Sequence, residues 1–127
     1  TGLSVFNFLM NRIAFVFNQP PHGHASGREG LDAVLATSAY SDQLAVFFMD
    51  DGVFQLVSNQ QPSTVLAKDH ASMFKLFELY DVENIYVLQQ SLDERELNTA
   101  RLIIPVVALS ISEFHKTLAQ YAIKLMF

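Results

Sequence analysis

A loop of histidines and glycines, residues 20–30, contains the residue types best suited to chemistry in this chain. It follows a short apolar run and opens a helical pattern, which is where α/β folds bind anions on free backbone N–H groups. Its glycines are spaced G-x-x-x-G-x-x-G, whereas a dinucleotide loop needs G-x-G-x-x-G and a P-loop needs Gly-Lys-Ser/Thr. Residues 23–27 also miss the G-x-S-x-G nucleophile elbow by one position. Nucleotide binding and serine hydrolysis are therefore disfavoured.

Two histidines of this loop, His22 and His24, form an H-x-H pair that could ligate a metal ion. A metal site needs at least a third ligand, and Asp50 and Asp51 follow another apolar run that is expected to end at the same sheet edge. However, Asp-Asp-Gly is ordinary turn chemistry, and loop histidines are usually solvated. The sequence therefore predicts no metal site. The remaining histidines are expected to be surface or packing residues: His70 and His115.

The chain of 127 residues contains no cysteine, which excludes disulfides, thiolate zinc sites and thiol nucleophiles. Eight basic and thirteen acidic residues give a net charge of −5, whereas a nucleic-acid-binding protein needs a basic face. Direct binding of tRNA or DNA is therefore disfavoured. Because only 17% of the residues are charged and 50% are hydrophobic, we expect part of the apolar surface to contact a partner.

No segment has the length and apolar character of a membrane span. The best candidate, residues 102–112, is half as long as the roughly 20 residues that a bilayer requires, and Pro105 interrupts it. Residues 1–9 have no basic residue before their apolar stretch and no convincing cleavage site, so no signal peptide is expected. Met10 is a plausible natural start. We therefore expect residues 1–9 to be an extension or foreign to the natural chain, and residues 10–127 to form one domain, compatible with the cytoplasm.

Apolar runs alternate with helical patterns from residue 12 onward. Nearly continuous apolar runs are typical of parallel strands covered on both faces. Strands are expected at residues 13–17, 43–49, 84–88, 103–109 and 121–127. Because Pro105 cannot donate to a strand ladder, the fourth strand should lie at an edge or begin late. The predicted fold is α/β: a single three-layer α/β/α domain with a mainly parallel sheet of about five strands.

Helix positions are indicated by shared faces and by caps. Two sets of side chains have helical spacing: Leu31, Val34, Leu35 and Ser38, and Met73, Leu76, Phe77 and Tyr80. A serine followed three residues later by a glutamate, the capping-box signature, occurs three times: Ser26 with Glu29, Ser91 with Glu94, and Ser110 with Glu113. We expect these acids to be structural. Six phenylalanines are expected in the core: Phe15, Phe17, Phe47, Phe48, Phe74 and Phe77.

Several short stretches, in this order, resemble one family. They are residues 12–17, 21–23, 27–33, 51–56 and 79–82, followed by 91–92 and 95–97. Together they are similar to the DsrF-like branch of the DsrE/DsrF/DsrH family, which includes the TusC-type subunits of the bacterial sulfur relay. The resemblance covers residues 10–127. It is specific because several short stretches occur in the same order, whereas any one of them alone would be a weak signal.

The resemblance implies a three-layer fold in a cytoplasmic hetero-oligomer with TusB-like and TusD-like subunits, assembled as a dimer of trimers. It also implies a role in passing persulfide sulfur toward 2-thiolation of the tRNA wobble uridine. In TusD-like members a cysteine carries the sulfur, and the matching position here is Val87 or Leu88. Neither side chain can hold a persulfide. The implied role is therefore that of a noncatalytic scaffold or interface subunit without a cofactor.

The partner-facing surface is expected at the carboxyl edge of the sheet, where the loops that follow parallel strands gather. The residues predicted for it are His22, Asp50, Asp51, Gly52, Val53, Phe54, Leu88, Gln89 and Gln90. Two alternatives remain open. One is a flavodoxin-like domain that binds a phosphate-containing ligand or a flavin with residues 20–29, and the other is a homo-oligomer that assembles from this chain alone.

Overall fold

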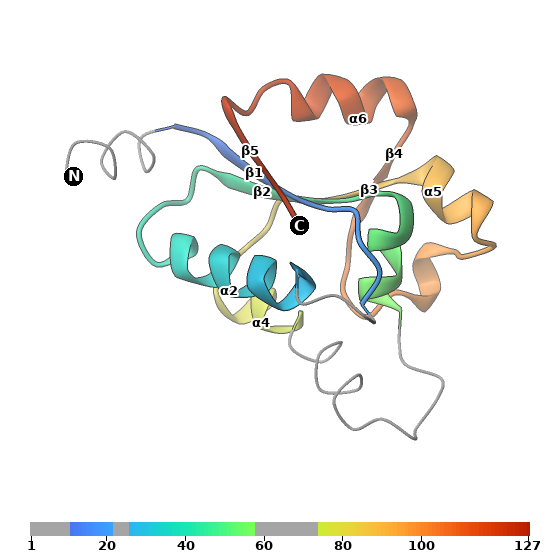
Figure 1. Cartoon of the computed structure of the whole chain (residues 1–127), viewed down its shortest axis with the longest axis horizontal. Helices are drawn as coiled ribbons and strands as arrows, with labels where there is room; N and C mark the ends of the chain where they lie inside the picture. Colours follow the sequence, from blue (N-terminus) through green and yellow to red (C-terminus); the bar gives the residue numbers. More distant parts are fainter. Residues whose placement is uncertain (1–10, 22–25, 58–73) are drawn as a thin grey trace.

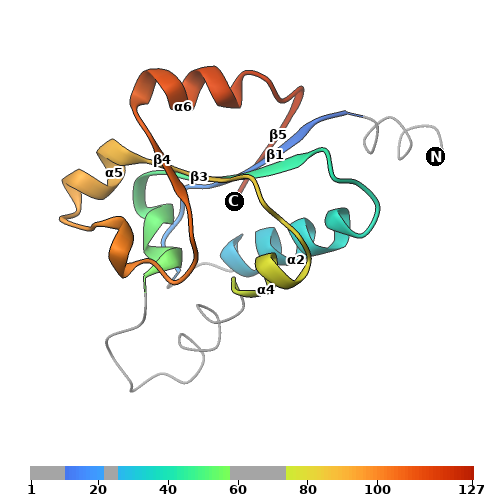
Figure 2. The same cartoon turned by 180° about the vertical axis from the view of Figure 1, so that it is seen from behind.

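A computed structural model of the chain describes residues 11–21, 26–57 and 74–127, which form three layers (Figures 1 and 2). The central sheet contains β1 (Ile13–Phe17), β2 (Leu44–Phe48), β3 (Ile85–Leu88), β4 (Val107–Leu109) and β5 (Ile123–Met126). The strand order is β4-β3-β2-β1-β5, and every pairing is parallel. Helix α6 (Ile111–Leu118) covers one face, and α2 (Ser26–Ser38) and α4 (Leu76–Leu79) cover the other. The predicted fold class is confirmed.

The edge position of the fourth strand is also confirmed. β4 begins at Val107, two residues after Pro105, and is shorter than the predicted 103–109 because the residues before it are used elsewhere. The Ile103 N–H donates to the Leu56 carbonyl at 2.9 Å, and Leu102 forms an isolated antiparallel bridge with Val57. This segment therefore contacts the chain that follows β2 before it enters the sheet.

Alternate side chains of the central strands enter two separate cores, one on each face. All residues of β1 and β2 are buried, because helices cover both faces. Phe17 lies on the α2 and α4 face, where its ring centroid is 5.0 Å from Phe48, 5.7 Å from Phe74 and 5.7 Å from Phe127. Phe47 packs against α6 on the other face. The six predicted core phenylalanines are confirmed as buried: Phe15, Phe17, Phe47, Phe48, Phe74 and Phe77.

Helix faces agree with the sequence pattern more closely than helix caps do. Leu31 and Val34 are buried on α2, as predicted. In the second predicted set Phe77 is buried, but α4 is only one turn long, Tyr80 is half exposed, and Met73 lies outside the described residues.

The predicted capping box of Ser110 with Glu113 is confirmed, and the predicted box of Ser26 with Glu29 is wrong. Ser110 caps α6, accepting the Glu113 backbone N–H while the Glu113 carboxylate accepts the Ser110 N–H. Ser26 is instead the first helical residue of α2, and its hydroxyl oxygen has no hydrogen-bond partner among the described residues. The box with Glu29 does not form because Ser26 lies inside the helix instead of at its N-cap.

Candidate functional site

Two segments that follow neighbouring strands meet at the carboxyl edge of the sheet. The 3-10 helix η1 (Asp50–Leu56) follows β2, and helix α5 (Gln89–Glu94) follows β3. Because β2 and β3 are adjacent and parallel, both segments leave the sheet at the same edge, and they lie side by side there (Figures 1 and 2). This is the edge at which the partner-facing surface is expected.

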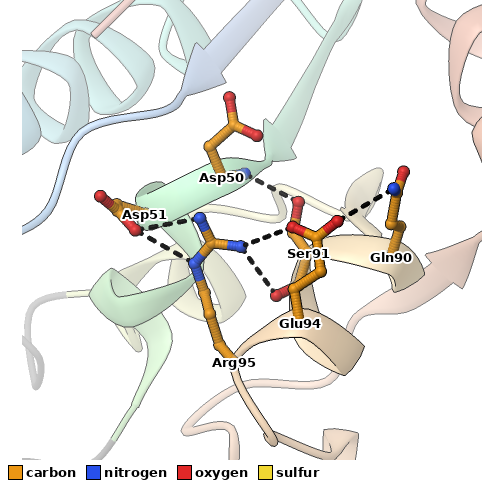
Figure 3. Close-up of polar contacts among 6 residues, drawn as sticks. All are labelled: Asp50, Asp51, Gln90, Ser91, Glu94 and Arg95. Carbon is orange, nitrogen blue, oxygen red and sulfur yellow. Dashed lines mark hydrogen bonds and ion pairs between the residues drawn. The ribbon is translucent and has the colours of Figure 1, made fainter.

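Ser91 makes the first connection between the two segments. Its hydroxyl oxygen accepts the Asp50 backbone N–H at 2.8 Å (Figure 3), and the residue is only 2% exposed. The predicted Ser91–Glu94 capping box is wrong, because α5 begins at Gln89 with Leu88 at its N-cap. The serine therefore lies inside the helix, and its hydroxyl is used in a tertiary contact.

Arg95 makes the second connection. Its Nη2 lies 3.0 Å from Asp51 Oδ1, and its Nε donates to the same oxygen at 3.1 Å. Its Nη1 donates to the Ser91 carbonyl at 3.1 Å and lies 3.6 Å from Glu94 Oε2 (Figure 3). The guanidinium is a rigid planar fork with five donors. A single side chain therefore holds η1 against the end of α5 in one geometry.

The backbone has a left-handed conformation on both sides of this network. Asp50 has φ 51° and Glu96 has φ 54°, values that cost a residue with a side chain about 1–2 kcal/mol. Such conformations persist where surrounding contacts hold them. Here the Asp50 N–H is held by Ser91, and Glu96 directly follows Arg95.

The described residues predicted for the partner surface divide into an exposed group and a supporting group. Phe54 is 37% exposed, and its ring centroid lies 6.0 Å from Arg95 Cζ. The other side chains that reach the surface are Asp50, Asp51, Gln89 and Gln90. Three residues are buried in the chain itself and support the surface from beneath: Gly52, Val53 and Leu88. His22 lies outside the described residues.

The two glutamines are ordered by bonds along α5. Gln89 Nε2 donates to Asp93 Oδ1 at 2.8 Å, and Gln90 Nε2 donates to Glu94 Oε1 at 2.9 Å. Pairs with this i, i+4 spacing stabilise a helix by a few tenths of a kcal/mol. The amide groups are therefore held along the helix surface.

Three members of this arrangement were not predicted for the surface: Ser91, Glu94 and Arg95. The sequence pattern predicts a helix cap for Ser91 and Glu94, and Arg95 enters only through the family resemblance. A usable signal was present, because Arg95 follows Ser91 at helical spacing and the acidic pair Asp50-Asp51 follows a neighbouring apolar run. An ion pair between the two loops was therefore a possible prediction once β2 and β3 were placed side by side.

The sequence and fold match known proteins. The DsrE/DsrF-like family matches residues 11–127. The chain belongs to this family. The TusC homolog of Vibrio vulnificus strain CMCP6 is 46% identical over 118 residues, which cover 93% of this chain and 100% of that protein. The TusC homolog of strain YJ016 is 53% identical over 97 residues, which cover 76% of this chain and 82% of that protein.

A solved structure shows the same fold. The ychN protein from E. coli superimposes with a TM-score of 0.74 at 22% identity, covering 93% of this chain and 100% of that chain. The resemblance of this chain to the TusC-type, DsrF-like branch of the DsrE/DsrF family is thus confirmed by the matches to TusC homologs.

The position that the resemblance matches to the carrier cysteine is part of the core in this DsrE/DsrF-like chain. Val87 is fully buried in the core that faces α2, and Leu88 is 7% exposed and belongs to the core under α6. Both side chains are apolar. The end of β3 therefore contributes packing where a carrier would need an accessible thiolate.

The glycine-rich loop that could serve the alternative ligand is only partly described. Residues 22–25, with His22 and His24, lie outside the described residues. At Gly27 an added Cβ would overlap the amide of Gln55, and Gln55 Nε2 donates to the Gln19 carbonyl at 3.1 Å. The packing of α2 against η1 therefore accounts for Gly27 without a ligand.

His115 and the helices of the described residues add no further site. His115 is exposed on α6, as predicted, whereas His70 lies outside the described residues. In the described ranges no group of three or more His, Cys, Asp or Glu residues is arranged to hold a metal ion. Of the helices in the described part of the chain, none has the length and apolar character needed to cross a membrane.

Replacing Ser91 by alanine should destabilise the protein by about 1–2 kcal/mol, because the Asp50 N–H loses its acceptor in a partly buried position. The free energy of unfolding in urea measures this. Ser112→Ala is the matched control, because Ser112 is exposed on α6 and reports only the gain in helix propensity. Equal stability of the two variants would show that the Ser91 hydroxyl does not hold η1.

Proposed function

We propose that this chain is a noncatalytic subunit of a cytoplasmic sulfur-relay complex that also contains TusB-like and TusD-like subunits. The complex would pass persulfide sulfur toward 2-thiolation of the wobble uridine of tRNA. One observation carries the proposal: the chain matches TusC homologs over most of its length but contains no cysteine. Its role in the relay is therefore to support subunits that have one.

The chemistry of sulfur transfer explains why the missing cysteine matters. An acceptor thiolate attacks the outer sulfur of a donor persulfide, a new S–S bond forms, and the donor leaves as a thiolate. Donor and acceptor must therefore both be cysteine residues, one carrying the persulfide and the other a thiolate. A chain without either contributes a binding surface and the correct placement of its partners.

The carboxyl edge of the sheet is the surface that best fits this role. Phe54 exposes an aromatic ring, and aromatic residues are enriched at protein interfaces. The exposed acids and glutamines of η1 and α5 provide polar groups around it. We assign the partner contact to the residues predicted from the sequence, with His22 included and with Gly52, Val53 and Leu88 as support.

Co-expression of this chain with TusB-like and TusD-like proteins tests the proposal. We expect one complex with the native mass of a dimer of trimers, measured by light scattering and native mass spectrometry. A chain that remains a monomer in the presence of both proteins would contradict the proposal. A homo-oligomer that excludes both proteins would favour self-assembly instead.

Thermal-shift measurements with flavins and nucleotides test the alternative ligand function. A ligand present at 100 times its Kd would add about 2.7 kcal/mol of stability. We expect no shift with any of these compounds. A saturable shift with a flavin would favour the flavodoxin-like alternative.

A further inference from the structure

Phe54 projects from the part of η1 that is otherwise anchored in the core. Val53, Gln55 and Leu56, its neighbours in η1, are buried, whereas the Phe54 ring is 37% exposed. Exposed aromatic side chains on a rigid support are the usual anchors of protein interfaces, because they bury a large area and lose little conformational entropy. The ring is therefore the strongest anchor candidate on the carboxyl edge.

The exposed beginning of η1 is held by contacts from α5 and the residue after it. The N-cap residue of η1, Met49, makes no side-chain cap bond. The beginning of η1 is instead held by the hydrogen bond from the Asp50 N–H to the Ser91 hydroxyl oxygen and by the ion pair between the Asp51 carboxylate and Arg95. Arg95 is 19% exposed in its side chain and contacts Asp51, the Ser91 carbonyl and Glu94. Its guanidinium thus lies between the two segments, with Arg95 Cζ 6.0 Å from the centroid of the Phe54 ring.

We propose that Arg95 is a positioning residue for partner binding, which holds η1 on α5 so that Phe54 enters an apolar recess on a partner subunit. The inference rests on the proposed function and deepens it, because it names the side chain that anchors the contact and the one that orients the anchor. The geometry in support is the set of Arg95 bonds shown in Figure 3.

The exposed charges of η1 and α5 specify the chemistry of that partner face. Four acidic side chains are exposed on η1 and α5: Asp50, Asp51, Asp93 and Glu94. Neither segment contains a Lys or Arg residue. The nearest cation in sequence, Arg95, directly follows α5 and already pairs with the carboxylates of Asp51 and Glu94. The described part of this surface therefore combines an excess of acidic side chains with an exposed aromatic ring. A complementary partner face carries Lys or Arg side chains around an apolar recess.

Affinity measurements on the full chain test the proposal. The probe is the purified TusB-like and TusD-like pair, and calorimetry gives the Kd. Phe54→Ala should weaken binding by about thirtyfold, as expected for an interface anchor. Arg95→Ala should weaken binding by about tenfold or more, and Arg95→Lys should also weaken it, because a single ammonium group cannot reproduce the planar fork.

A double variant separates positioning from direct contact. If Arg95 acts through Phe54, then Arg95→Ala combined with Phe54→Ala should bind no more than about twofold more weakly than Phe54→Ala alone, because coupled residues are non-additive. Fully additive losses would show that Arg95 contacts the partner by itself and would overturn its positioning role. Binding of the wild-type chain should also weaken as salt increases.

Two matched controls test the location of the surface. Tyr40→Ala removes an aromatic ring that is 78% exposed after α2, and Lys116→Ala removes an exposed positive charge on α6. We expect both to bind within about twofold of the wild-type chain.

The outcomes distinguish this inference from the proposed function. Normal binding by Phe54→Ala and Arg95→Lys would overturn the inference while the complex itself still forms. A wild-type chain that does not bind the pair would overturn the proposed function as well. If Arg95→Ala fails to fold, Arg95→Lys and the exposed-ring variant Phe54→Ala still decide the question.

Discussion

Replacement of Gly52 by alanine is expected to destabilise the protein by at least about 3 kcal/mol, at or above the upper end of the cost of overpacking. A Cβ at this position would overlap the Phe17 carbonyl oxygen and carbonyl carbon, which belong to the backbone at the end of β1. That carbonyl already accepts the Met49 N–H at 3.0 Å. Relief of the overlap would require movement of β1 or η1, so urea unfolding should show a large loss of stability or no folded protein.

Gly27→Ala is the matched control for this variant. The atoms that a Cβ would meet at Gly27 belong to the end of the Gln55 side chain, which can shift. Gly27 also lies in α2, where alanine gains about 1 kcal/mol of helix propensity over glycine. We expect a much smaller net change than at Gly52. Equal losses in the two variants would show that the backbone at Phe17 can move away from η1.

Replacement of Phe17 by alanine is expected to cost about 3–5 kcal/mol, the range for removing a buried phenylalanine. Phe17 is fully buried and packs against the rings of Phe48, Phe74 and Phe127. The cavity would lie beneath the carboxyl edge that supports η1. Chemical denaturation monitored by circular dichroism measures the change in the free energy of unfolding.

Phe54→Ala provides the same truncation at an exposed position on the same edge. We expect it to cost less than about 1 kcal/mol, because its ring is partly in solvent in the isolated chain. The contrast separates a residue that stabilises the fold from one that is available to a partner. If Phe54→Ala destabilised the chain as much as Phe17→Ala, the ring would be part of the core and the anchor assignment would fail.

Local sequence patterns predicted most of the fold. The apolar run of β1 was predicted with its observed bounds, because five consecutive apolar residues leave few alternatives to a strand covered on both faces. Pro105 correctly indicated an edge strand that begins late. The caps were predicted less well, since a shift of up to three residues in the helix start changes the role of a serine. Ser110 lies at the N-cap of its helix, whereas Ser26 and Ser91 lie inside their helices.

The sequence predicts the edge at which η1 and α5 meet, but not the contacts that join them. The edge formed by η1 and α5 follows from the order of two strands and the rule that loops after parallel strands gather together. The bonds that join these segments link Asp50 with Ser91, 41 residues apart, and Asp51 with Arg95, 44 residues apart. No local pattern encodes such pairs.

The order of residues along the chain was enough to establish the α/β class, the membership of the DsrE/DsrF family and the lack of any thiol that could carry sulfur. These properties depend on residue types and short-range periodicity. Which side chains meet at the carboxyl edge was decided by the packing of β2 between β1 and β3. The neighbour β3 brings Arg95 to Asp51, and the neighbour β1 places the Phe17 carbonyl against Gly52. Contacts of that kind arise only when distant segments are placed together, because their energies depend on distances of a few ångströms in space and not on separation along the chain.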